Sequence, residues 1–244
     1  MNDPGAAESL ALDARPGDAH YRAYVGPPRD YDLVAAMGFG LLVHLGLRQQ
    51  HRVLDIGCGS LRIGRLLIPY LNRGGYTGLE PNGWLVEEGI EREVGRDQVR
   101  IKAPEFVVAD NARSLIARGA RFDYMLAQSI FSHTGPDLLD RWLGEATQLL
   151  DDAGTLVATY LEGDEDPAET GWIYPGCVLF RRDTMEAMAA RHGLQFVPLD
   201  WHHPRQRWAL FAKPGFDAAW YRDRALSWNA CFARIEGRRQ VVAD

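Results

Sequence analysis

Short apolar runs alternate with helical patterns between residues 52 and 160, and this alternation constrains the fold more than any other feature of the chain. Strands separated by helices pair in parallel through right-handed crossovers. The pattern therefore predicts an α/β fold with a Rossmann-like, doubly wound sheet that is buried on both faces. The expected strands are 53–57, 76–80, 105–109, 122–127 and 154–160, and the expected helices between them are 60–72, 82–94, 112–118 and 136–151.

The segments on either side of this alternating region have other patterns. Residues 1–19 are rich in Ala, Asp, Gly and Pro, and we expect them to be flexible. Residues 20–50 are expected to form a helical cap, with Asp30 as the N-cap of its main helix. The core is expected over 51–213, with a substrate-side loop near 161–176, a strand at 177–181, a helix at 183–192 and a strand pair at 194–201 and 207–213; a helix and tail follow over 214–244, with the helix at 216–235.

Composition excludes several classes of partner and location. The chain has 244 residues and a net charge of −6, so binding to nucleic acid through phosphate neutralisation is not expected. Its three cysteines are scattered and form no C-x-x-C pair, which indicates free thiols in a reducing compartment. The N-terminus lacks the basic and apolar regions of a signal peptide, and no apolar run reaches the roughly 20 residues of a membrane span. We therefore expect a cytoplasmic protein with no membrane partner.

A glycine pair follows the first expected strand, in the stretch from Val53 to Gly64. Gly57 and Gly59 let the turn adopt strained angles and let a ligand approach the backbone closely. A dinucleotide fingerprint would place its third glycine three residues after the second, whereas the next glycine here is Gly64, and no G-K-[ST] of a P-loop follows. Asp55 stands two residues before the first glycine, where it would repel a pyrophosphate but suit a cationic or zwitterionic ligand.

Asp55-Ile56-Gly57-Cys58-Gly59 resembles the first motif of class I S-adenosylmethionine-dependent methyltransferases, and the resemblance extends over residues 50–160. It implies a seven-stranded sheet, mostly parallel with a C-terminal antiparallel hairpin, and S-adenosylmethionine as cofactor with S-adenosylhomocysteine as product. It also implies that Glu80 binds the ribose hydroxyls, that Asp110 contacts the adenine edge and that Gln128 lies near the methionine part. The cofactor-binding residues expected on this basis are Asp55, Gly57, Cys58, Gly59, Arg62, Glu80, Pro81, Asp110, Asn111, Gln128 and Tyr31.

One position departs from the family pattern, because Leu61 stands where many members carry a third glycine. The neighbouring Arg62 is then either a partner for the cofactor's carboxylate or an acidic acceptor, or only a surface cation. Tyr21, Tyr24 and Tyr31 precede the core, where this family builds a lid over the cofactor. Ordinary packing of an N-terminal helix is the alternative for these tyrosines.

His133 is the candidate catalytic base, because the resemblance places its loop opposite the methyl donor and because the pKa of histidine suits proton transfer. The alternative is a structural histidine that caps the turn before Pro136. His202 and His203 are adjacent, but no carboxylate or cysteine lies at a helpful spacing, so no metal site is expected.

The loop after the fourth expected strand reads Gln128-Ser129-Ile130-Phe131. It lacks the Asp/Asn-Pro-Pro-aromatic signature of enzymes that methylate exocyclic base nitrogens. We therefore expect O- or N-methylation of a small molecule, in specialised or sugar metabolism. The alternatives are a protein or peptide methyltransferase, an NAD-dependent oxidoreductase and a non-catalytic, cofactor-binding regulator; the oligomeric state stays open, with a homodimer as one option.

Overall fold

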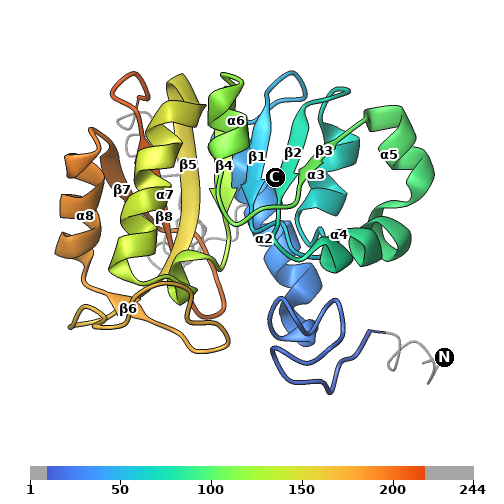
Figure 1. Ribbon diagram of the computed structural model, residues 1–244, viewed down its shortest axis with the longest axis horizontal. Coiled ribbons are helices and arrows are strands. Elements are labelled where there is room, and N and C mark those ends of the chain that lie inside the picture. Colours follow the sequence, from blue (N-terminus) through green and yellow to red (C-terminus); the bar gives the residue numbers. More distant parts are fainter. Residues whose placement is uncertain (1–9, 218–244) are drawn as a thin grey trace, which may run out of the picture.

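The computed structural model describes residues 10–217, in which helices cover both faces of an eight-stranded sheet (Figure 1). Seven strands follow the order β3-β2-β1-β4-β5-β8-β7, and the short β6 pairs with β5 outside this path. The strands are β1 (Val53–Ile56), β2 (Tyr76–Leu79), β3 (Glu105–Val107), β4 (Phe122–Ala127), β5 (Leu150–Glu162), β6 (Leu179–Phe180), β7 (Gln195–Leu199) and β8 (Arg207–Ala212).

The pairing confirms the predicted fold class. β1 lies between β2 and β4 and pairs with both in parallel, with Asp55 opposite Gly78 on one side and Leu126 on the other. β4 and β5 are also parallel, whereas β8 pairs with β5 and with β7 in antiparallel register. The sheet is therefore mostly parallel and ends in a C-terminal antiparallel hairpin.

Two helical layers enclose the sheet, each over its own apolar core. Leu115, Leu143 and Met185 are buried in one core, which places α6, α7 and α8 on that face. Leu41 and Leu67 are buried in the other, with α2 and α3. The helical segments are η1 (Pro28–Asp30), α2 (Tyr31–His44), α3 (Gly64–Tyr70), α4 (Gly83–Gly89), the π-helical η2 (Ile90–Val94), α5 (Arg96–Lys102), α6 (Arg113–Ala117), η3 (Phe131–His133), α7 (Pro136–Leu149) and α8 (Arg182–Arg191).

Several expected segments differ from the structure in their bounds, and one cannot be compared with it. The helix expected over 82–94 changes at Ile90 from α-helical to π-helical, and the additional helix α5 follows it. The fifth strand begins at Leu150, four residues earlier than expected. The helix expected over 216–235 lies almost wholly outside the described residues.

The carboxyl ends of β1, β2 and β4 meet where the strand order reverses. β1 leads to β2 on one side of the sheet and β4 lies on its other side, so the loops after β1 and β4 diverge at this point. Ligands of doubly wound folds bind in the crevice that such a divergence opens. Within residues 10–217, no helix has the length and apolar content that crossing a membrane requires.

Candidate functional site

The turn after β1 is held in a conformation that needs its glycines. Gly57 and Gly59 have φ values of 64° and 52°, in the left-handed region that favours glycine. The amides of Gly57 and Cys58 donate to the carbonyl of Leu79 at 2.8 and 3.1 Å, which ties the turn to the end of β2. A side chain on Gly57 would collide with Ile130, and one on Gly59 would lie 2.7 Å from Cγ1 of Val25. The two glycines thus leave room for another group close to the backbone of the turn. In this structure the side chains of Ile130 and Val25 occupy that room.

Two carboxylates flank this turn, as the sequence predicted. Asp55 is buried at the end of β1, and Tyr76 Oη donates to its Oδ2 at 2.8 Å. Burial raises the pKa of Asp55 to about 7, against the lowering effect of the Tyr76 hydrogen bond. Glu80 follows β2, and its Oε2 accepts from the amide of Gly59 at 3.0 Å, while its Oε1 accepts from the amide and the side chain of Asn82. Both carboxylates are therefore fixed in place before any ligand arrives.

A small cavity lies between the glycine turn and the loop after β4. Its volume is about 20 Å³, little more than one water molecule needs. Val25, from the N-terminal segment, forms part of its wall. The predicted residues that line it are Asp55, Gly57, Cys58, Gly59, Arg62 and Gln128.

Arg62 is the positive charge of this cavity. Only 7% of its surface is exposed, and its guanidinium donates to the carbonyl of Val25 at 3.0 Å and to Oε1 of Gln128. Burial lowers the pKa of Arg62 to about 10. No carboxylate of residues 10–217 forms an ion pair with it, although Arg62 lies near the buried Asp55. Because a buried cation is costly without a countercharge, this guanidinium suits an anionic group of a ligand. It is not a surface cation, which settles one of the two alternatives left open by the sequence.

Gln128 occupies the first position after β4, next to a buried histidine. Its Nε2 donates to Oγ of Ser129 at 2.5 Å and lies 3.5 Å from Nε2 of His203. Nδ1 of His203 accepts from the amides of Arg205 and Gln206, so its Nε2 carries the proton when the ring is neutral. Burial, with the nearby Arg62 and Arg205, lowers the pKa of His203 to about 3. No cluster of three potential metal ligands occurs in the described part of the chain.

His133 ends η3, the short helix after β4. Its Nδ1 lies 2.6 Å from the carbonyl of Gly176, and since a carbonyl only accepts, Nδ1 carries the proton and Nε2 is the basic nitrogen. Burial lowers the pKa of His133, so the ring is neutral near pH 7. The rings of Trp172 and Tyr174 surround it at 5.7 and 4.9 Å between centroids. A neutral imidazole among aromatic rings has the chemistry of a proton acceptor.

Five of the predicted cofactor-binding residues do not line the cavity, and the fixed carboxylate Glu80 is one of them. Pro81 and Asp110 are exposed, and Asn111 donates to Oδ1 of Asp110 at 2.7 Å. They lie after β2 and β3, on the same sheet edge as the glycine turn. Tyr31 is fully buried, and its hydroxyl donates to the carbonyl of Ser60 at 3.0 Å. A ligand contact for any of them stays a prediction.

The N-terminal segment supplies one site residue that the sequence did not indicate, Val25. Val25 covers Gly59, and Tyr24 packs against Trp84 and Tyr174 at centroid distances of 5.2 and 5.9 Å. The tyrosines had suggested a lid, but nothing in the local pattern marks Val25, because its contacts depend on tertiary structure alone.

Comparisons with known proteins agree with this geometry. Residues 54–156 match a family model described as a methyltransferase domain. Among solved structures, magnesium protoporphyrin IX methyltransferase (ChlM) from Synechocystis PCC 6803, with bound SAM, is similar with a TM-score of 0.59 at 12% identity, over 87% of this chain and 92% of that one. The 1,6-didemethyltoxoflavin-N1-methyltransferase of Burkholderia thailandensis is similar with a TM-score of 0.55 at 17% identity, over 89% of this chain and 92% of that one. Mitomycin 7-O-methyltransferase MmcR is similar with a TM-score of 0.57 at 17% identity, over 79% of this chain and 56% of that one. The chain thus matches a methyltransferase domain over residues 54–156 and shares the fold of these solved methyltransferases.

Proposed function

We propose that the protein transfers a methyl group from S-adenosylmethionine to an oxygen or nitrogen of a small-molecule acceptor, in specialised or sugar metabolism and in the cytoplasm. The observation that carries the proposal is the set of charges around the glycine turn. Glu80 supplies a fixed carboxylate of the kind that binds ribose hydroxyls, and Arg62 supplies a buried guanidinium that forms no ion pair with any carboxylate of the described residues. A zwitterionic nucleoside carries the groups that complement both.

The residues present fit this cofactor in their chemistry. Arg62 suits its carboxylate, Glu80 its ribose, and Gly57 and Gly59 leave backbone free for close approach. Asp110 and Asn111 are the proposed adenine contacts, and Tyr31 and Pro81 stay among the proposed neighbours. When bound, the cofactor supplies a methyl group that its sulfonium makes electrophilic. Val25 of the N-terminal segment forms part of the cavity wall, so this segment would lie against the bound cofactor.

His133 is the proposed general base on the acceptor side. Its neutral Nε2 would accept the proton that a hydroxyl or amine of the acceptor loses, while Gly176 holds its Nδ1 proton. The aromatic rings of Trp172 and Tyr174 give this region an apolar wall. The names of the solved neighbours support a small-molecule acceptor, since those proteins are named for a porphyrin, a toxoflavin precursor and mitomycin.

Calorimetry with three ligands tests the proposal. We expect S-adenosylhomocysteine to bind and NAD to give no heat, because the turn lacks the dinucleotide fingerprint. Arg62→Met should weaken S-adenosylhomocysteine binding by about tenfold or more, which is the usual scale for a lost charged hydrogen bond. It should spare 5′-methylthioadenosine, which lacks the carboxylate. Binding of NAD by the wild type, or equal losses for both nucleosides in the variant, would contradict the assignment.

A further inference from the structure

Residues 20–30, which we call the strap, lie across the glycine turn. Val25 fills the space above Gly59, and its carbonyl accepts from Arg62 at 3.0 Å. The strap is also held from the acceptor side, because Tyr174 Oη donates to the carbonyl of Tyr24. The carbonyl of Val25 thus occupies the acceptor position opposite Arg62 that a ligand's carboxylate would take.

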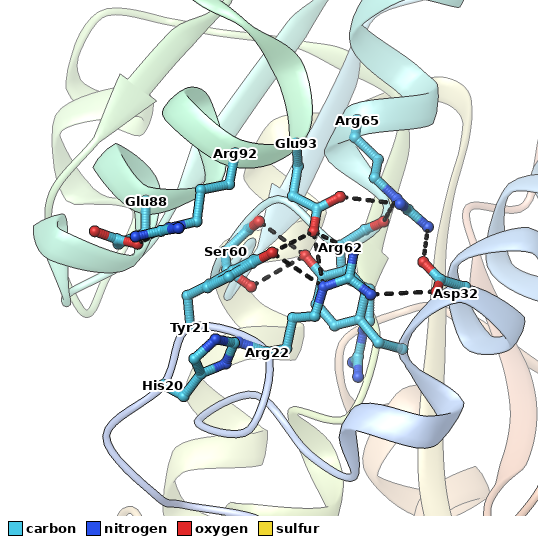
Figure 2. Close-up of polar contacts among 11 residues, drawn as sticks. His20, Tyr21, Arg22, Asp32, Ser60, Arg62, Arg65, Glu88, Arg92 and Glu93 are labelled. Carbon is cyan, nitrogen blue, oxygen red and sulfur yellow. Dashed lines mark hydrogen bonds and ion pairs between the residues drawn. The ribbon is translucent and has the colours of Figure 1, made fainter. Parts of the chain in front are cut away.

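A ring of four charges fastens the strap to the core (Figure 2). Arg22 bonds to Glu93 at 2.6 Å and to Asp32 at 3.2 Å, and Arg65 bonds to the same two carboxylates at 3.0 and 2.6 Å. We call Arg22, Asp32, Arg65 and Glu93 the latch. Only Arg22 belongs to the strap; Glu93 lies in η2, Arg65 in α3 and Asp32 in α2. The latch therefore joins the strap to three helices of one face.

Glu93 is the critical member of the latch. Its side chain is only 4% exposed, and it accepts from Arg22, from Arg65 and from the hydroxyl of Tyr21. Replacing this carboxylate by an amide would leave Arg22 and Arg65 with only the exposed Asp32 as a shared countercharge within the latch. A buried charge that loses its partner is strongly destabilised, and lifting the strap returns Arg22 to water. Loss of Glu93 should therefore favour the open strap.

The latch also touches the glycine turn. The guanidinium of Arg22 lies 4.5 Å from the ring centroid of Tyr31, and that of Arg65 lies 5.4 Å from it. The Tyr31 hydroxyl donates to Ser60, the residue after Gly59. The charges that hold the strap are thus packed through one tyrosine against the loop that the strap covers.

We propose that the strap is an internal competitor for the cofactor site and that the latch sets the fraction of molecules in which the site is open. The proposal rests on the function proposed above. A ligand carboxylate at Arg62 and the closed strap compete for the same guanidinium, because the carbonyl of Val25 already accepts from it at 3.0 Å. When only an open fraction binds, the apparent affinity is reduced by that fraction. Weakening the latch then strengthens binding, whereas damage to an ordinary structural contact weakens it.

The test compares Glu93→Gln with Glu105→Gln. Glu105 pairs with Arg118 in an exposed ion pair on β3, so its amide variant removes a carboxylate without touching the strap. By stopped flow with S-adenosylhomocysteine, Glu93→Gln should bind about tenfold faster than wild type through its larger open fraction, and Glu105→Gln should bind at the wild-type rate. Arg22→Gln is a second variant that removes the strap's own charge, and Arg22→Lys should restore slower binding.

Hydrogen exchange supplies a reading that needs no ligand. The amides of Tyr24 and Gly26 donate within the strap, to His20 and Ala23. In Glu93→Gln these amides should exchange faster, while those of the sheet exchange as in wild type. If the strap amides of Glu93→Gln exchanged at the wild-type rate, the claim that the latch holds the strap closed would be overturned.

The binding results separate the two proposals. Faster strap exchange together with slower or weaker binding would show that the strap holds the ligand instead of competing with it, and would overturn the inference alone. Absence of S-adenosylhomocysteine binding in wild type and in an opened Glu93→Gln would overturn the proposed function, and with it the competition. Binding by Glu93→Gln that exceeds wild type would support both.

Discussion

Asp55 links the site to the stability of the protein. It is 4% exposed, and burial raises its pKa to about 7 from an ordinary value of 3.8. Between about pH 4 and pH 7, the Asp55 carboxyl is therefore ionised in the unfolded chain but still protonated in the folded protein. The contribution of Asp55 is therefore most favourable below about pH 4 and declines as pH rises to about 7.

Asp55→Asn should remove this pH dependence, because an amide keeps an acceptor for the hydroxyl of Tyr76 but does not ionise. The variant should gain thermal stability relative to wild type as pH rises from about 4 to about 7, with no further gain above. Melting temperatures of both proteins across this range check it. If the difference in melting temperature between the variant and wild type were the same at about pH 4 and about pH 7, the Asp55 carboxyl would not titrate as described.

His133→Ala should lower kcat by about 10²-fold or more and leave KM nearly unchanged, as expected for loss of a general base. Because burial lowers the pKa of His133, the acidic limb of the wild-type kcat profile should lie below pH 6.5, and the variant should lack it. Once an acceptor is found, kcat against pH measures both. A variant that raises KM but keeps kcat and the acidic limb would assign His133 to the pocket wall.

At the scale of elements, α4 packs directly onto the glycine turn. A Cβ on Gly89 would lie 2.5 Å from the carbonyl oxygen of Ser60 and 2.7 Å from its carbon. These are backbone atoms of the turn and cannot rotate away. The helix can approach this closely only because position 89 has no side chain.

Gly89→Ala should therefore lower the free energy of unfolding by about 1–3 kcal/mol, the range for overpacking, although alanine favours helix. Gly83→Ala, in the same helix, is the matched control, since its Cβ would meet Val108 at 3.6 Å, an ordinary contact. Urea denaturation of the two variants gives the comparison. Equal free energies of unfolding for the two variants would mean that α4 can shift away from the turn without loss of stability.

The predicted elements and the missed ones differ in how they bury side chains. β4 was predicted at its observed bounds, because every residue but Asp123 is buried and the apolar run is plain. α5 was missed because none of its residues is fully buried, so no apolar period marks it. The turn carboxylates Asp55 and Glu80 were predicted from local motifs. The latch was not, since Arg22 and Glu93 are 71 positions apart, and charges on separate segments carry no pairing signal in one sequence.

At the scale of the whole molecule, β8 joins the two cores. Adjacent side chains of a strand point to opposite faces, and here Leu210 enters the core under α2 and α3 while Phe211 enters the core under α6, α7 and α8. Phe211 also packs against Phe131 at a centroid distance of 5.9 Å, and Phe131 begins the short helix that ends at His133. The C-terminal hairpin thus supports η3, the short helix that carries the proposed base, as well as the sheet.

This position predicts that substitutions on either face of β8 act on one cooperative unit. Phe211→Ala should cost about 3–5 kcal/mol and Leu210→Ala about 2–5 kcal/mol of unfolding free energy, the ranges for large-to-small changes in a core. Because β8 pairs with both β5 and β7, each variant should unfold in a single transition that circular dichroism and tryptophan fluorescence report at the same urea concentration. Separate transitions by the two probes would mean that the hairpin folds independently of the parallel strands, and that the acceptor side can loosen while the glycine turn stays formed.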